Sequence, residues 1–130
     1  MSAHGRVLVV DDDREILEMT ALLLRGGEYD PVLAASGDEA LYTVQESPPD
    51  LILLDINMPG LDGWEVLRVL KEDESAAHIP VVMFSVNFEL RDKLRALQQG
   101  ATDYVTKPFD TGRLLARIGE ILSAPAGRRP

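Results

Sequence analysis

Five polar side chains stand where apolar runs of the sequence end. They are, in chain order, Asp11, Asp12, Asp55, Ser85 and Lys107. The carboxyl ends of parallel strands meet at one edge of a sheet, so runs of this kind would bring these side chains together. Two carboxylates ~5 Å apart repel each other by roughly 3 kcal/mol at an effective dielectric constant of 20. We therefore expect either protonation or a bound cation to relieve the repulsion.

The expected cation is Mg²⁺. A site built from carboxylate oxygens favours this hard ion over zinc, and the chain has no cysteine that could supply a thiolate ligand. Mg²⁺ keeps several of its waters, which leaves room for a phosphoryl oxygen. With Lys107 and the Ser85 hydroxyl, the ion would form an electrostatic clamp around Asp55. A carboxylate in such a clamp can act as a nucleophile and form an aspartyl-phosphate.

The elements that would position these residues alternate along the chain. The predicted strands are short apolar runs, which cover residues 6–10, 31–35, 51–54, 79–84 and 103–106. Each run is followed by a segment with apolar residues at helical spacing, which predicts five helices. Alternating strands and helices favour an α/β fold, with a five-stranded parallel sheet covered by helices on both faces.

Polar residues predict where several helices begin. Asp13, Ser36, Asp62 and Asp110 are the expected N-caps, because a side-chain oxygen at this position accepts a hydrogen bond from a free backbone N–H. Glu39 stands three residues after Ser36, and the two would form a capping box.

The composition describes a single acidic domain. The chain has 130 residues and a net charge of −9, which makes direct nucleic-acid binding by this domain unfavourable. It has neither the apolar core of a signal peptide nor a run of ~20 apolar residues that could span a membrane. We expect a cytoplasmic domain over residues 1–122 and a linker or disordered tail over 123–130, a segment rich in Ala, Pro, Gly and Arg.

The sequence resembles the response-regulator receiver domains of two-component signalling. The segments VLVVDDD, PDLILLDINMPGLDGWE, IPVVMFS and GATDYVTKPF match the motifs of that family in order, over about residues 6–122. The resemblance implies the flavodoxin-like strand order 2-1-3-4-5, for which receiver domains are a standard example. It also implies a phosphoacceptor signalling domain rather than an enzyme, with a sensor histidine kinase or a phosphotransfer protein as its partner.

The resemblance assigns the metal ligands and the acceptor. Asp55 would accept the phosphoryl group. Asp12 and Asp55 would bind Mg²⁺ through their carboxylates, and Asn57 would bind it through its backbone carbonyl. Asp11 would hold a metal-bound water. The side chain of Asn57 is then free for another role.

The resemblance also assigns the phosphoryl contacts and a switch. Lys107 would pair with the phosphoryl oxygens, and Ser85 would hydrogen-bond one of them. Tyr104 matches an aromatic residue that turns inward when that hydroxyl moves toward the phosphoryl group. The bond between Lys107 and Pro108 is usually cis in this family. The switch would remodel the face made by the fourth helix, the strand 103–106 and the last helix, through which some members form homodimers.

Two positions differ from the commonest family pattern. Ser85 replaces a more frequent threonine but keeps the hydroxyl. Val86 stands where a small residue is usual, and together with Asn87 it is expected at the rim of the pocket. Valine is larger than alanine and stiff about χ1, so it would narrow the path to the acceptor.

Three other functions compete for the same residues. A phosphatase of the haloacid-dehalogenase type also forms an aspartyl-phosphate, but its motif has a second aspartate where this chain has Asn57. A flavodoxin-like cofactor binder would need a phosphate loop rich in Ser, Thr and Gly in place of DDDRE. A calcium-binding loop in DDDREI lacks its turn glycine, since Ile16 occupies that position. Two organisations stay open, namely a stand-alone receiver and a receiver joined to an output domain.

Overall fold

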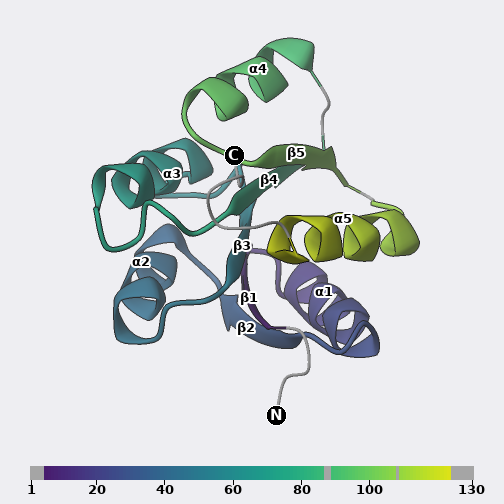
Figure 1. Cartoon of the computed structure of the whole chain (residues 1–130). Helices are drawn as coiled ribbons and strands as arrows, with labels where there is room; N and C mark the ends of the chain where they lie inside the picture. The colour runs from purple at the N-terminus through teal and green to yellow at the C-terminus, as the bar shows by residue number, and fades with distance from the viewer. Residues whose placement is uncertain (1–4, 87–88, 108, 124–130) are drawn as a thin grey trace.

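Strands and helices alternate throughout the computed structural model, which describes residues 5–86, 89–107 and 109–123 (Figure 1). The strands are β1 (Arg6–Val10), β2 (Asp30–Ala34), β3 (Leu51–Asp55), β4 (Val81–Ser85) and β5 (Asp103–Thr106). The helices are α1 (Arg14–Gly26), α2 (Gly37–Glu46), α3 (Gly63–Glu72), α4 (Leu90–Gln98) and α5 (Thr111–Ser123). No helix in this described part of the chain has the length and apolar character needed to cross a membrane.

The five strands form one parallel sheet in the order β2-β1-β3-β4-β5. The predicted α/β class and the strand order implied by the resemblance are therefore confirmed. The predicted fourth strand began two residues too early. Pro80 has no N–H to donate to a sheet, and the structure accordingly begins β4 at Val81. The second strand also begins and ends one residue before its predicted position.

Helices cover both faces of the sheet, and the sheet separates the core into two parts (Figure 1). One part packs α2, α3 and α4 against the sheet, and the other packs α1 and α5 against the opposite face. Successive residues of β3 contribute to opposite parts, with Ile52 and Leu54 on one side and Leu51 and Leu53 on the other. The strand is therefore buried on both faces, which explains why its sequence is apolar without alternation.

Side-chain caps fix the entry of several helices next to the sheet. Each capping side chain accepts a hydrogen bond from a backbone N–H of the first turn. Asp13 accepts from Glu15, Ser36 from Glu39, Asp62 from Glu65, and Asp110 from Arg113. All four predicted N-caps are thus confirmed. At Ser36 the structure has the bond to the Glu39 amide, whereas both bonds of a capping box join Asp62 and Glu65.

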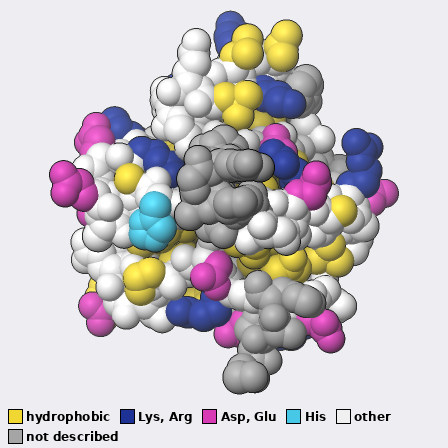
Figure 2. Space-filling view, viewed as in Figure 1, with side chains coloured by type: hydrophobic (Ala, Val, Ile, Leu, Met, Phe, Trp, Pro, Cys, Tyr) yellow, Lys and Arg dark blue, Asp and Glu magenta, His cyan; other side chains and the backbone are white. Residues whose placement is uncertain are grey.

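The helix α4 is more exposed than its sequence pattern suggests. Leu90, Leu94 and Leu97 follow helical spacing, yet they are 63%, 52% and 41% exposed. Within α4 only Ala96 is buried. Figure 2 shows hydrophobic side chains on the surface in the region of α4, at the top of the view. Because large apolar groups gain free energy when they leave water, this stripe is a candidate contact surface.

We expect Thr102→Val to stabilise the domain. Thr102 directly precedes β5, and its buried hydroxyl has no hydrogen-bond partner in the described residues. A valine of the same shape removes the cost of that unpaired hydroxyl, so the free energy of unfolding should rise by about 1 kcal/mol in urea denaturation. Thr43→Val is the matched control, because the Thr43 hydroxyl donates to the Glu39 carbonyl oxygen at 2.8 Å. An equal gain in both variants, or a loss at Thr102, would contradict this interpretation.

Candidate functional site

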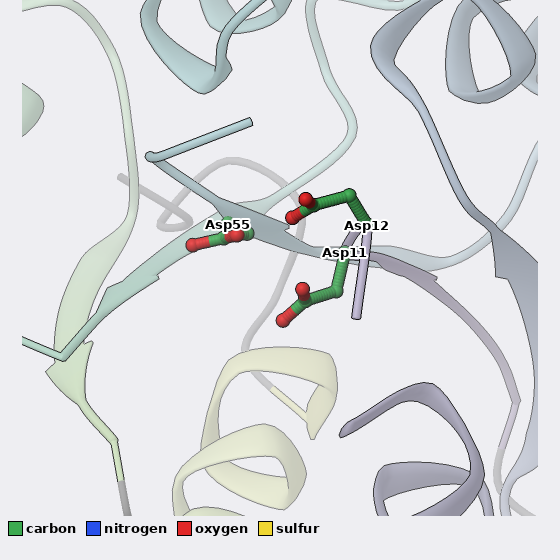
Figure 3. A group of neighbouring side chains, drawn as sticks. All are labelled: Asp11, Asp12 and Asp55. Atoms are coloured by element: carbon green, nitrogen blue, oxygen red, sulfur yellow. The ribbon is translucent and has the colours of Figure 1, made fainter. Parts of the chain in front are cut away.

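Three carboxylates from the ends of β1 and β3 converge at one edge of the sheet (Figure 3). One oxygen from each of Asp11, Asp12 and Asp55 lies within 4.8 Å of the others. Asp12 is exposed, whereas Asp11 is buried and Asp55 is only 4% exposed. The sequence predicts Asp55 at the open ends of the strands. The structure shows that its side chain is buried there, because β3 continues through Asp55, which pairs with Phe84 in β4.

Lys107 reaches this cluster from the end of β5. Its Nζ lies 2.8 Å from Oδ2 of Asp11 and 3.5 Å from Oδ1 of Asp55. It also lies 4.7 Å from the centroid of the Phe84 ring. Three carboxylates and one ammonium give the cluster a formal charge of −2. A divalent cation would restore neutrality.

The electrostatic cost of this arrangement appears at Asp55. Burial of the carboxyl group, with the nearby Asp11 charge as a second cause, raises the pKa of Asp55 to about 6. The Lys107 ammonium and the backbone N–H of Asn57 lower the pKa, but they offset only part of that rise. Asp55 is thus a carboxylate that is destabilised near neutral pH, and a bound cation would stabilise its ionised form.

The backbone after each acidic strand end holds the carboxylates in place. Oδ1 of Asp11 accepts a hydrogen bond from the N–H of Asp13, and Oδ1 of Asp55 accepts one from the N–H of Asn57 at 3.3 Å. These bonds orient two of the acidic side chains toward the common space. Asp13 itself lies outside the cluster and caps α1, as predicted.

Gly63 is a positioning residue that was not predicted from the sequence. Its N–H donates to the carbonyl of Ile56, and a Cβ atom at this position would lie 2.3 Å from the carbonyl oxygen of Asp55. Only glycine allows the first turn of α3 to approach the acceptor strand this closely. The available signal was the Asp62-Gly63 pair, in which a glycine directly follows a helix N-cap.

Ser85 connects the acidic cluster to Tyr104. The Nδ2 of Asn57 donates a hydrogen bond to Oγ of Ser85 at 3.4 Å, so the Asn57 side chain has a contact that the sequence did not assign. The side chains of Ser85 and Tyr104 are also hydrogen-bonded, and Tyr104 is buried. Burial raises the pKa of Tyr104, and the bond with Ser85 opposes that rise. The predicted switch residues are therefore in direct contact, with Tyr104 turned inward.

The expected rim of the pocket is described only in part. Val86 directly follows β4 and is exposed. Asn87 lies outside the described residues, and so does Pro108, whose bond with Lys107 was expected to be cis.

The donors at this site fit Mg²⁺. The cluster offers carboxylate oxygens alone, and the exposed Asp12 leaves one side open to water, which suits an ion that retains part of its hydration shell. Asp12, Asp55 and the backbone carbonyl of Asn57 would be the ligands, while Asp11 is already paired with Lys107.

Comparisons with known proteins identify the family. Residues 7–119 match the model of the response regulator receiver domain. The chain is 42% identical over 113 residues to the DNA-binding response regulator MtrA of Mycolicibacterium smegmatis, covering 87% of this chain and 48% of that protein. It is 41% identical to the phosphate regulon transcriptional regulatory protein PhoB of Klebsiella pneumoniae, covering 90% and 51%. The chain therefore spans about half the length of these relatives.

Solved structures agree with this match. The chemotaxis protein CheY4 of Vibrio cholerae superposes with a TM-score of 0.85 at 30% identity, over 91% of this chain and 98% of that one. The receiver domain of the Francisella response regulator 1452 gives a TM-score of 0.84 at 33% identity, over 91% and 95%.

We expect Asp55→Asn to stabilise the metal-free protein more at high pH than at low pH. Folded Asp55 keeps its proton up to about pH 6, whereas the unfolded chain releases it near pH ~4. The folded state thus binds more protons in this interval, so the stability of the wild-type protein falls as pH rises through it. Asparagine removes this ionisation. The gain in unfolding free energy, measured in urea with a chelator, should be ~1–3 kcal/mol near pH 7.5 and clearly smaller near pH 5.

The control for this pH experiment is Asp13→Asn, which removes a carboxylate outside the cluster and keeps a capping side chain. A gain at Asp55 that is equal at both pH values, or larger at the lower one, would contradict the proposed cost of ionisation.

A comparison of two adjacent aspartates tests the metal ligands. Asp12→Ala should weaken Mg²⁺ binding at least about tenfold, because it removes a carboxylate of the cluster. Asp13→Ala should change Mg²⁺ affinity little and should instead lower the unfolding free energy by ~1 kcal/mol, because it removes an N-cap. Fluorescence of Trp64, the only tryptophan of the sequence, or amide chemical shifts would follow the titration. Equal losses of affinity in the two variants would show that the ligand is wrongly assigned.

Proposed function

The chain belongs to the response regulator receiver domain family, and we propose that it accepts a phosphoryl group on Asp55 in a Mg²⁺-dependent step. The donor is the phosphohistidine of a sensor histidine kinase or of a phosphotransfer protein, in the cytoplasm. The observation that carries this proposal is the buried Asp55 carboxylate between Asp11, Asp12 and the Lys107 ammonium.

In the proposed reaction, a carboxylate oxygen of Asp55 attacks phosphorus. An O–P bond forms as the N–P bond of the donor breaks, and the leaving imidazole nitrogen takes up a proton from water. Bound Mg²⁺ would neutralise the carboxylates and the charge on the phosphoryl oxygens. Lys107, whose Nζ lies 2.8 Å from Asp11, would pair with one of these oxygens, and the Ser85 hydroxyl would donate to another. With a pKa of about 6, Asp55 is mostly ionised near pH 7.5 and can act as the nucleophile.

The environment of Asn57 favours a phosphoacceptor over a turnover phosphatase. A phosphatase of the haloacid-dehalogenase type needs a carboxyl group there as its general acid. The Asn57 amide cannot supply that proton, and its Nδ2 is directed at Ser85. We therefore propose a domain that assists its own phosphorylation and dephosphorylation but does not turn over other phosphorylated substrates.

Phosphorylation is proposed to act on the face formed by α4, β5 and α5. A phosphoryl group on Asp55 would draw the Ser85 hydroxyl toward it and change the bond between Ser85 and Tyr104 in β5. On this face an ion pair joins Arg117 of α5 to Asp103 of β5 at 2.7 Å, and α4 carries the exposed leucines. We propose a homodimer through this face as one route to output.

The output itself is proposed to lie in other parts of a longer protein or in a partner. The names of two relatives describe DNA-binding or transcriptional regulators, and this chain matches about half of each. An output through DNA is the corresponding proposal for a regulator that contains this chain. The receiver, with a net charge of −9, would contribute no direct nucleic-acid contact.

Val86 is proposed to limit access to the acceptor. It follows Ser85 directly and is exposed, which supports a position at the rim of the site. In-line displacement requires the donor or the attacking water to approach close to the axial direction, so a stiff side chain there would slow both loading and hydrolysis.

Incubation with a small phosphodonor and Mg²⁺ tests the proposed function. Acetyl phosphate or phosphoramidate should add one acid-labile phosphoryl group by intact mass, and a chelator should prevent the addition. Asp55→Ala should abolish labelling, whereas Asp13→Ala should retain it. Full labelling of Asp55→Ala at another residue would refute the assignment of the acceptor. Repeated hydrolysis of a generic phosphomonoester would instead favour a phosphatase.

A further inference from the structure

The ring of Phe84 lies beneath the Lys107 ammonium, next to the acceptor. Nζ of Lys107 is 4.7 Å from the centroid of this ring, within the range of about 6 Å over which an aromatic face attracts a cation. Phe84 is buried, and the side chain of Lys107 is only 11% exposed. Little water competes for the ammonium there, which strengthens its attraction to the ring.

The ring differs in kind from the other partners of the ammonium. Asp11 accepts a hydrogen bond from Nζ at 2.8 Å, and Oδ1 of Asp55 lies 3.5 Å from Nζ. Both partners are carboxylates that a divalent cation would neutralise, and Asp55 would lose its own charge on becoming an acyl phosphate. The ring has no net charge and takes no part in the reaction. Its attraction for Lys107 therefore persists when the carboxylates are occupied.

Phe84 itself has a fixed position beside the acceptor strand. It pairs with Asp55 in the sheet, and its carbonyl oxygen accepts a hydrogen bond from the N–H of Ile56 at 3.1 Å. Its ring packs in the part of the core next to α1 and α5, where the Phe109 ring meets it at 72° with the two centroids 6.2 Å apart. The surface under Lys107 is thus held in place relative to Asp55.

Burial alone does not require an aromatic ring at position 84. An aliphatic side chain of similar size would also fill the core near the end of β4, but only an aromatic one offers a face to a cation. Lysine is a flexible four-carbon chain that ends in a strongly hydrated charge. Without the ring, the Lys107 ammonium would be freer to turn toward water, as the charged ends of partly buried lysines commonly do.

We propose that Phe84 is a positioning residue for phosphoryl transfer, which holds the Lys107 ammonium beside Asp55, where it pairs with a phosphoryl oxygen. This inference rests on the proposed function and adds a residue that does not itself touch the phosphoryl group. A cation that is already in place loses less freedom when the ligand binds, so the ring increases the affinity of the site for a phosphoryl group. Because the ring acts through Lys107, its effect disappears when that lysine is replaced.

The affinity for beryllofluoride in saturating Mg²⁺ tests this role. The ligand adds to a carboxylate as a mimic of the phosphoryl group, and amide NMR signals would measure the bound fraction. Phe84→Leu should bind it about three- to tenfold more weakly than the wild-type protein, the equivalent of ~0.7–1.4 kcal/mol. In a Lys107→Met background, the same substitution should change the affinity by less than about twofold.

Fluorinated phenylalanines at position 84 separate the effect of the ring face from that of packing. Fluorine atoms withdraw electron density from the face and leave the shape of the ring nearly unchanged, so the affinity should fall in steps as more of them are added. Val82→Ala is the matched control, because it truncates a buried side chain in the same strand and the same part of the core. It should lower the unfolding free energy but keep the wild-type affinity.

If Phe84→Leu does not fold, the fluorinated series decides alone. An affinity that does not change with fluorination would overturn the role of the ring face and leave the proposed function intact. Equal losses of affinity in Phe84→Leu and Val82→Ala, or a loss that persists in the Lys107→Met background, would do the same. A wild-type protein that does not bind beryllofluoride in Mg²⁺ would overturn both the role of Phe84 and the proposed function.

Discussion

Repulsion among three carboxylates, offset by a single lysine, is the constraint on which the site depends. Asp55 is buried because β3 continues through it, and Asp11 is buried beside it. Water is therefore a poor source of stabilisation for these charges, and the pKa of Asp55 rises to about 6. The fold holds an acidic group in an unfavourable environment, and a bound cation would relieve that cost.

The parallel sheet makes this arrangement possible. Asp11 and Lys107 follow strands that are three positions apart in the sheet, a separation of ~14 Å from the usual spacing of neighbouring strands. The two side chains meet across the ends of β3 and β4, and the Lys107 ammonium also lies over the ring of Phe84. A shorter cation at this position could not reach Asp11. The strand order therefore explains why the site uses a long cationic side chain.

Most of the fold and the clustering of the acidic residues with Lys107 could be predicted from the sequence, because both depend on local patterns. Apolar runs that end in polar residues predicted the strands, and the parallel topology then required Asp11, Asp55 and Lys107 to converge. Other features depend on distant contacts. The spacing of Leu90 and Leu94 predicts a helix but does not indicate that these side chains face water. Likewise, the Asp62-Gly63 pair marks the start of a helix but does not indicate how closely that helix approaches Asp55. The stack of the Arg95 guanidinium on the Trp64 ring joins two separate segments and has no signature within either.

The measurement that tests the role of charge repulsion most directly is an NMR titration of the Asp55 side-chain carboxyl carbon with and without Mg²⁺. We predict a pKa of about 6 for Asp55 in the metal-free protein, because the carboxyl group is buried beside Asp11. Saturating Mg²⁺ should lower that pKa by about 1 or more, since a bound divalent cation favours the ionised form. A pKa near ~4 in both conditions would show that Asp55 is an ordinary carboxylate, and it would contradict a site governed by repulsion among its carboxylates.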